Sequence, residues 1–141
     1  MVVISATNHY KERAKEIIEM NQNDYDVIYV TSDFAHIQKE KFICDVENSI
    51  QLHVTPYYRN ISIKRMWSHC IFSFKAFFLM MKLKPKKVYA EIPNNTLAMA
   101  MSFYKKFSKC ELIFDVFDMW PESFPNKPEN ALFRMAMRVW R

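Results

Sequence analysis

The chain has 141 residues, half of them hydrophobic and a quarter charged, and it carries a formal net charge of +5. This length and composition are typical of one globular domain with its own core, and they exclude a largely disordered chain. The chain contains no glycine, which excludes the glycine-rich loops of P-loop and dinucleotide-binding proteins. The three cysteines have no CxxC spacing, so neither a zinc site nor a disulfide framework is indicated, and a reducing cytoplasmic compartment fits best.

Short apolar runs alternate with longer segments of helical period along the chain. The short runs, bounded by polar residues or proline, predict strands at 2–5, 26–31, 50–55, 87–92 and 111–117. The longer segments predict helices at 9–21, 63–83, 96–107 and 129–141. This alternation predicts an α/β fold, a doubly wound parallel sheet with helices on both faces.

The predicted helix 63–83 has the clearest periodicity. We expect its main apolar stripe to pack against the sheet as core: Ile63, Met66, Trp67, Cys70, Ile71, Phe74, Phe77, Phe78 and Met81. A second apolar row contains Phe72 and Leu79 and lies beside Lys75 and Lys82. A helix that is apolar on two sides is either deeply buried or partly inserted in a membrane interface, and both readings stay open here.

The positive charge is concentrated in one part of the chain. Residues 48–90 contain eight lysines and arginines and no acidic residue, whereas the rest of the chain has a net charge of −3. This asymmetry indicates either an anionic partner on one face or a solvated basic surface. If the partner is an anionic membrane, the expected contact residues are Lys64, Arg65, Phe72, Lys75, Leu79 and Lys82.

Polar and aromatic residues follow every predicted strand. Ligands of open parallel sheets bind beyond the carboxyl ends of the strands, where these loops converge. Aromatic rings beside hydrogen-bonding groups suit sugars. The candidate substrate-binding residues are Asn8, His9, Asp33, His36, Tyr58, Arg59, Asn60, Arg65, Asn94, Asp118, Trp120 and Glu122.

Each candidate also has a purely structural interpretation. Asp118 could cap a turn, Trp120 could belong to the core, and Glu122 could be a surface charge. His36 could lie in a loop without a task, and His69 is more typical of a surface or semi-buried residue than of a ligand. The histidines and cysteines have no metal-ligand spacing, so no metal site and no cofactor are expected.

Several stretches together resemble a known enzyme family. The stretch DMWPESFP at 118–125 is similar to the Asp-Leu-Trp-Pro-Glu signature of family 4 glycosyltransferases. TPYYRNISIKRMWSH at 55–69 resembles the Tyr-x-x-Asn-x-Ser-x-x-Arg-x-x-Ser-His segment of a bacterial subgroup that acts in capsule and O-antigen polysaccharide biosynthesis. TSDFAHIQKEK at 31–41 and VYAEIP at 88–93 resemble further segments of that subgroup, in the same order.

The resemblance implies one half of a two-domain GT-B enzyme. Residues 1–125 would be the Rossmann-like N-terminal domain that binds the acceptor, and 126–141 would begin a connecting helix that the chain leaves incomplete. The domain that binds the nucleotide-sugar would then be absent, and we expect this chain alone to be inactive. The resemblance places Asp118 and Glu122 at the interdomain cleft as the candidates for catalysis, although the catalytic residues themselves stay unknown. The loop 6–10 lacks the glycines of many relatives, so donor contact is not expected there.

The resulting prediction is a hexosyltransferase that moves a sugar from a nucleotide-sugar to a lipid-linked glycan, with retention of anomeric configuration and without metal. It would lie in the cytoplasm, peripheral at the inner face of the cell membrane. One alternative is the non-catalytic half of a split glycosyltransferase. A second alternative is a basic Rossmann-like nucleic-acid binder, but the chain has no recognition motif for nucleic acid, and nucleic acid is not an expected partner.

Overall fold

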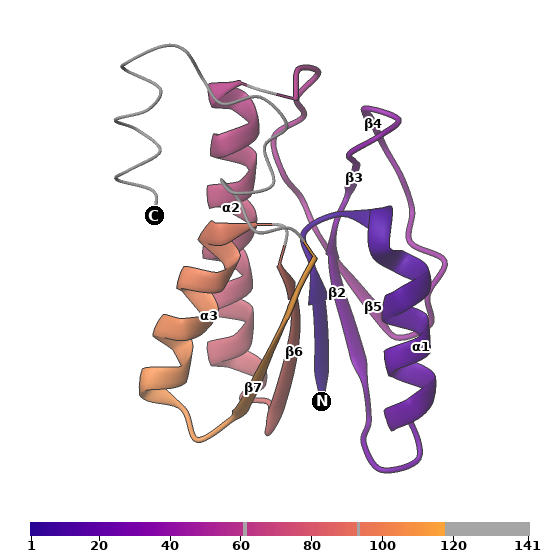
Figure 1. Ribbon diagram of the computed structural model, residues 1–141, viewed down its shortest axis with the longest axis vertical. Helices are drawn as coiled ribbons and strands as arrows, with labels where there is room; N and C mark the ends of the chain where they lie inside the picture. The colour runs from indigo at the N-terminus through magenta and orange to yellow at the C-terminus, as the bar shows by residue number, and fades with distance from the viewer. Residues whose placement is uncertain (61, 93, 118–141) are drawn as a thin grey trace.

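A computed structural model of the protein describes residues 1–60, 62–92 and 94–117 (Figure 1). Its main sheet has five strands in the order β5-β2-β1-β6-β7, and all four neighbouring pairs are parallel. The strands are β1 (Val2–Ser5), β2 (Ile28–Ser32), β5 (Ser49–Leu52), β6 (Lys87–Ile92) and β7 (Glu111–Val116). The predicted α/β fold with a doubly wound parallel sheet is confirmed.

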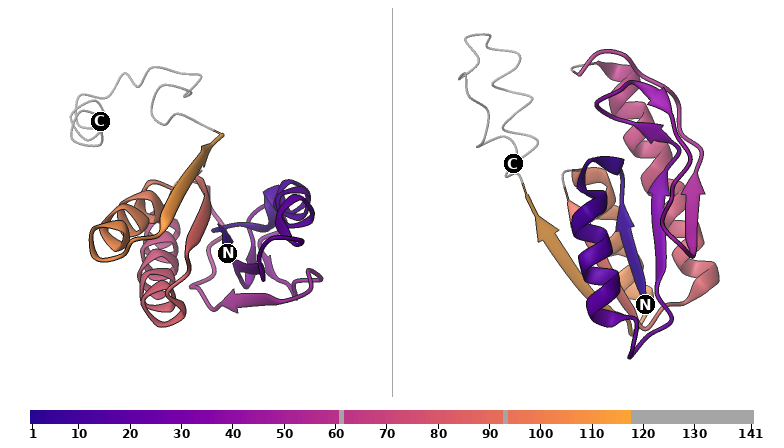
Figure 2. Two further views of the ribbon diagram at one scale, coloured as in Figure 1. Left: turned by 90° about the horizontal axis from the view of Figure 1, so that it is seen from below. Right: turned by 90° about the vertical axis from the view of Figure 1, so that its right-hand side faces the viewer.

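Helices cover both faces of this sheet. A short 3-10 turn, η1 (Asn8–Tyr10), leads into α1 (Lys11–Asn21) on one face. The other face is covered by α2 (Ile63–Leu83) and α3 (Asn95–Phe107), as the views in Figure 2 show. The expected helix 129–141 lies outside the described residues, as do Asp118, Trp120 and Glu122.

Side-chain caps begin α2 and α3, and a left-handed residue other than glycine ends α2. The Ser62 hydroxyl accepts a hydrogen bond from the Arg65 amide at 3.2 Å, and the Asn94 side chain accepts one from the Thr96 amide at 3.1 Å. α2 ends at Lys84, whose φ of 48° and ψ of 52° are left-handed. A left-handed conformation costs a residue with a Cβ about 1–2 kcal/mol, and Lys39 bears the same cost at a φ of 60°.

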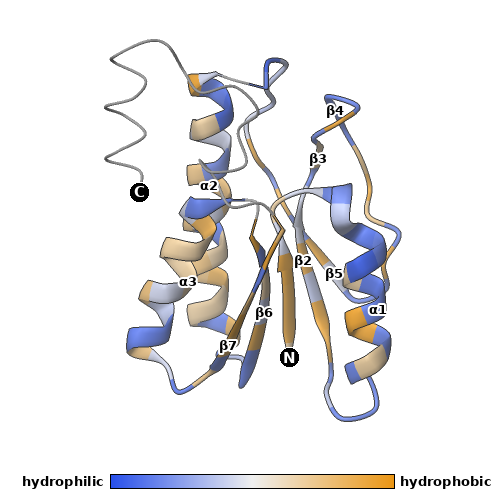
Figure 3. Cartoon of the chain, viewed as in Figure 1, coloured by the Kyte–Doolittle hydropathy of each residue, from blue (hydrophilic) through white to orange (hydrophobic). Residues whose placement is uncertain are grey.

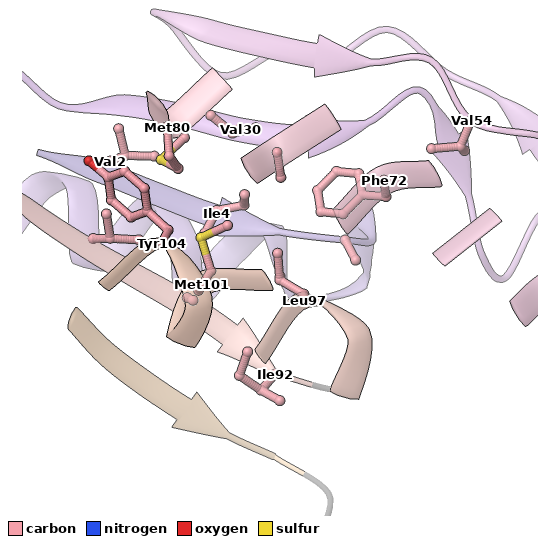
Figure 4. Close-up of a cluster of buried hydrophobic side chains, with 14 of the residues drawn as sticks. Val2, Ile4, Val30, Val54, Phe72, Met80, Ile92, Leu97, Met101 and Tyr104 are labelled. Atoms are coloured by element: carbon pink, nitrogen blue, oxygen red, sulfur yellow. The ribbon is translucent and has the colours of Figure 1, made fainter. Parts of the chain in front are cut away.

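The main core lies between the sheet and the α2–α3 layer (Figure 4). Even-numbered strand residues such as Ile4 and Val30 point into it, and Phe72, Met80 and Leu97 meet them from the helices. Odd-numbered strand residues form a smaller cluster under α1. The alternation follows from the two-residue period of strands, and it makes both faces of the sheet largely apolar.

The predicted core stripe of α2 is wrong. Trp67 is 62% exposed and Phe74 is 65% exposed, whereas Phe72 is 1% exposed and Ala76 is fully buried. The inward face carries small residues, including Ser68 and Ala76, which let α2 approach the sheet and α3 closely. Both apolar rows recur at helical spacing, so periodicity could not choose between them.

Two expected membrane contacts are corrected by the same packing. Phe72 belongs to the core and does not reach the surface, and Leu79 is half-buried against the core. The exposed residues of the expected contact set are Lys64, Lys75 and Lys82. None of the described helices combines the length and apolar character that crossing a membrane requires.

A small hairpin that the sequence analysis did not predict stands at the carboxyl edge of the sheet. β3 (Phe34–Ala35) pairs with β4 (Glu40–Lys41) in antiparallel fashion, above the ends of the main strands in Figure 1. Its turn is closed by a 2.9 Å hydrogen bond from the Lys39 amide to the Ala35 carbonyl. The hairpin brings the residues that follow β2 back over this edge.

Candidate functional site

The carboxyl edge of the sheet contains a topological switch point. The strand order reverses between β1 and β6, so the connections that follow these two strands diverge to opposite faces and leave a crevice. Thr7 and Asn8 follow β1, and Asn94 caps α3 after β6. Three buried atoms here have no hydrogen-bond partner among the described residues: Thr7 Oγ1, Asn8 Oδ1 and Asn94 Nδ2. The crevice therefore has unused hydrogen-bonding capacity.

Polar residues from three segments meet beside this crevice. We call them the histidine–arginine cluster: His36, Lys39, Tyr57, Asn60, Arg65 and His69. The Tyr57 hydroxyl lies 2.7 Å from His36 Nδ1, and the Tyr57 ring lies between the two imidazoles, with its centroid 5.7 Å from that of His36 and 6.1 Å from that of His69. Buried Tyr57 thus joins the segment after β2 to the helix α2.

Two cations of the cluster converge on one residue. Arg65 Nη1 donates to the Asn60 carbonyl at 2.7 Å, and Lys39 Nζ donates to the Asn60 side-chain oxygen at 2.6 Å. Lys39 Nζ also lies 5.0 Å from the centroid of the Tyr57 ring, in a cation–π arrangement. Arg65 Nε donates to His69 Nε2 at 3.2 Å, so this neutral imidazole carries its proton on Nδ1.

The electrostatics of the cluster hold both histidines neutral. Burial, together with the charges of Arg65, Lys39 and His9, lowers the pKa of His36 to about 4. Burial, Arg65 and His36 lower the pKa of His69 to about 4, against a hydrogen bond to Asn94 that raises it. At neutral pH the cluster therefore presents two cations, two neutral imidazoles and a phenol, which suits an anionic or hydroxyl-rich ligand.

A small pocket opens beneath the cluster. Tyr57 and His69 form part of its wall, together with Phe34, Val54 and Phe72 and the smaller residues Ala6, Ser32 and Ser68. It lies at the ends of β1 and β2, next to the inner face of α2. The pocket gives the cluster an apolar floor, which is typical of ligand sites that pair a few polar groups with an apolar surface.

A second polar arrangement crosses the opposite face of the sheet. Thr31, Ser5, Glu91 and Asp115 are register partners on four neighbouring strands. Glu91 is fully buried, and neither of its carboxylate oxygens has a hydrogen-bond partner among the described residues. Burial raises the pKa of Glu91 to about 7, although the Ser5 hydroxyl and Arg13 partly oppose this shift and Asp115 adds to it. The Ser5 hydroxyl also donates to the Thr7 carbonyl at 2.9 Å.

The predicted site residues are distributed unequally. His36, Asn60 and Arg65 lie in the histidine–arginine cluster, and Asn94 lies beside it. Asn8 lines the crevice, while His9 is exposed on η1 close enough to influence His36. No described contact joins the exposed Tyr58 and Arg59 side chains to the cluster.

Asp33 has protein partners for both of its oxygens. One accepts from the Val54 amide at 2.9 Å, and the other lies 2.6 Å from His53 Nδ1. Burial would raise the pKa of Asp33, but these bonds outweigh it and hold the pKa below its usual range. Asp33 therefore fastens the end of β2 to the segment after β5.

Three members of the cluster were not among the predicted site residues: Lys39, Tyr57 and His69. Each carries a spacing signal that points to it. Tyr57, rather than Tyr58, stands three residues before Asn60 and so fits the Tyr-x-x-Asn spacing. Lys39 follows His36 by three residues, and His69 follows Arg65 by four residues on one helix.

The chemistry of the described site does not include a metal centre. Within 1–60, 62–92 and 94–117, no group of three or more histidine, cysteine, aspartate or glutamate side chains is placed to hold a metal ion. No family model matches the chain, and no curated protein and no solved structure is significantly similar to it.

Proposed function

We propose that this chain is the acceptor-binding part of a glycosyltransferase that moves a sugar from a nucleotide-sugar to a lipid-linked glycan. Its family 4 likeness rests on sequence motifs alone. The observation that carries the proposal is the meeting of the 31–41 and 55–69 motif segments in the histidine–arginine cluster, through His36 with Tyr57 and Lys39 with Asn60. This cluster borders the switch point of a parallel sheet, which is the place where such folds bind their ligands.

The chemistry of the cluster fits a glycan acceptor with a charged attachment group. Neutral His36 and His69, together with Tyr57, offer donors and acceptors for sugar hydroxyls. Thr7 and Asn94 add unused hydrogen-bonding atoms in the adjoining crevice. A carboxylate base is not needed for binding, so the use of Asp33 in fastening two strands does not weaken the proposal.

The outer face of α2 and α3 supports contact with a membrane. Four phenylalanines of this face are more than half exposed: Phe74, Phe78, Phe103 and Phe107. The ring of Phe77 lies 5.4 Å from that of Phe78 within α2 and 5.7 Å from that of Phe103 on α3, between ring centroids. We call this aromatic face the phenylalanine ridge. Exposed lysines flank it: Lys75, Lys82, Lys105 and Lys106. Figure 3 shows this mixture of apolar and polar residues along both helices.

Aromatic residues beside lysines are typical of surfaces that lie in an anionic lipid interface. Such a contact would hold the carboxyl edge of the sheet near a lipid-linked acceptor. The proposed location is accordingly peripheral, at the inner face of the cell membrane.

A transferase assay tests the proposed function. The chain, together with any continuation of its reading frame, is incubated with bacterial membrane extract and a panel of radiolabelled nucleotide-sugars. We expect one donor to label the lipid-extractable fraction, and Arg65→Gln to reduce that labelling. Absence of labelling with every donor, under conditions where a known glycosyltransferase labels the same extract, would contradict the proposal.

Vesicle sedimentation tests the membrane contact separately. We expect the chain to bind phosphatidylglycerol vesicles at low salt, and Phe78→Ser to weaken binding by about tenfold, since one buried phenylalanine contributes roughly 1.5–3 kcal/mol. Ile43→Ser is the matched control, because Ile43 is 91% exposed but lies between β4 and β5, away from the ridge. Equal weakening by both variants would contradict a defined contact face.

A further inference from the structure

We propose that Lys39 and Arg65 bind a phosphoryl group, which lies against the side of Asn60 where the two cations meet. The inference rests on the proposed function for the source of that group, the phosphate or diphosphate of a lipid-linked acceptor. The binding itself is argued from the described contacts alone.

The charge of the cluster is unbalanced. Lys39 and Arg65 approach two oxygens of the same residue, Asn60, which is neutral. Burial and the charge of Arg65 both lower the pKa of Lys39, so the two cations lie close enough to repel each other. Neither forms an ion pair with a carboxylate among the described residues. A bound anion would remove this repulsion.

The backbone of Lys39 is strained. Its φ of 60° places it in the left-handed region, where asparagine or glycine would be more stable. The hydrogen bond from its amide to the Ala35 carbonyl fixes the turn, and the lysine side chain is thereby held over Tyr57 and against Asn60. Strained backbone that positions a cation is a feature of ligand sites more than of plain turns.

Arg65 keeps donors that the described contacts do not use. The contacts of Arg65 use Nε and Nη1, and Nη2 has no partner among the described residues. A guanidinium fork matches the oxygens of a phosphoryl group better than a single ammonium does. The amino end of the 21-residue helix α2, capped by Ser62, lies in the same segment and adds positive potential.

The pKa values of the neighbouring histidines report whether an anion is bound in the cluster. His36 faces Arg65 from α2, Lys39 from the hairpin turn and His9 from η1, and His69 faces Arg65, His36 and Asn94. A bound anion offsets the positive charges that surround each of the two histidines, so it raises the pKa of His36 and of His69. A ligand held elsewhere on the surface leaves these values unchanged.

The direct test is a titration of the full chain with inorganic pyrophosphate at pH 7 and low salt, followed by isothermal calorimetry and by NMR of the histidine rings. We expect saturable binding and a rise in the pKa of both histidines. Lys39→Asn should weaken binding by about tenfold, as loss of one charge-assisted contact does. Lys84→Asn is the matched control, since Lys84 is also left-handed but terminates the far end of α2.

A second pair of variants distinguishes loss of a specific contact from loss of folding. Arg65→Gln should weaken pyrophosphate binding at least as much as Lys39→Asn does, whereas Lys64→Gln removes an exposed charge next in sequence and should change it less than about twofold. Circular dichroism establishes that each variant is folded. Non-saturable binding, or equal weakening by Arg65→Gln and Lys64→Gln, would show only diffuse attraction to a basic surface and would overturn the proposal.

Two competition experiments distinguish an acceptor diphosphate from a lipid headgroup as the source of the phosphoryl group. A water-soluble short-chain prenyl diphosphate sugar should compete with pyrophosphate for the site, which would support an acceptor diphosphate. If instead phosphatidylglycerol vesicles alone displace pyrophosphate, and Arg65→Gln abolishes this displacement, the site takes a lipid headgroup. Pyrophosphate binding without any transferase activity would retain the phosphoryl site and count against the proposed enzyme, so the two failures are distinguishable.

Discussion

Replacing Glu91 with glutamine should make the protein more stable at alkaline pH. Glu91 is fully buried on the α1 face of the sheet, and its carboxylate oxygens have no hydrogen-bond donor among the described residues. Its pKa is 4.5 in a solvated chain and about 7 in the fold, chiefly because burial disfavours the charge. Each pKa unit corresponds to about 1.4 kcal/mol, so ionised Glu91 costs the fold about 3 kcal/mol.

The sign of the pH dependence follows from the two protonation states. Between pH 4.5 and about 7, folded Glu91 holds a proton that unfolded Glu91 has released. The Glu91 cost is therefore absent below pH 4.5, develops as the pH rises from 4.5 to about 7, and is fully present above that range. Glu91→Gln stays neutral, so it should match the natural chain at pH 4.5 and exceed it at pH 8 by about 3 kcal/mol, or roughly 10 °C in Tm.

The assay is urea denaturation of both proteins from pH 4.5 to 8.5, with the difference in the free energy of unfolding taken at each pH. The difference cancels opposing groups such as His36 and His69, whose lowered pKa values weaken the fold as the pH falls below 6.5. Glu111→Gln is the control, because Glu111 is an exposed residue of β7. A Glu91→Gln variant that follows the natural chain at every pH would refute the assignment of this cost to Glu91.

Other substitutions test the packing and the helix ends. Phe72→Ala should lower the free energy of unfolding by about 3–5 kcal/mol, because Phe72 fills the main core. Phe78→Ala should change this free energy by less than about 0.5 kcal/mol, because Phe78 is 53% exposed. Chemical denaturation measures both values. Asn94→Ala should cost about 1 kcal/mol, since it removes the cap of α3, and Asn94→Ser should recover most of this loss in the same measurement. Lys84→Asn should raise the Tm in a thermal melt slightly, because asparagine adopts the left-handed backbone at the end of α2 at a lower cost than lysine. A lower Tm would contradict a conformational cost at Lys84.

The order and type of the elements were predictable because they depend on local signals. The predicted bounds of β1, β6 and α2 agree with the structure. The β3–β4 hairpin was missed because its strands have only two residues each, too few for alternation to be visible. The site candidates His36 and Asn60 were found from their positions after predicted strands, and Arg65 was found from the family resemblance of the segment 55–69.

The sequence by itself determined that this is a parallel α/β fold and that polar residues gather at one edge of its sheet, because strand and helix periods are properties of adjacent residues. The tertiary structure alone decided which apolar row of α2 is buried, since both rows fit a helix and only packing against α3 and the sheet separates them. It also decided that Lys39 and Arg65 meet on Asn60, and that Glu91 is buried without a donor. Those features depend on residues far apart in the chain, whose placement no local pattern fixes.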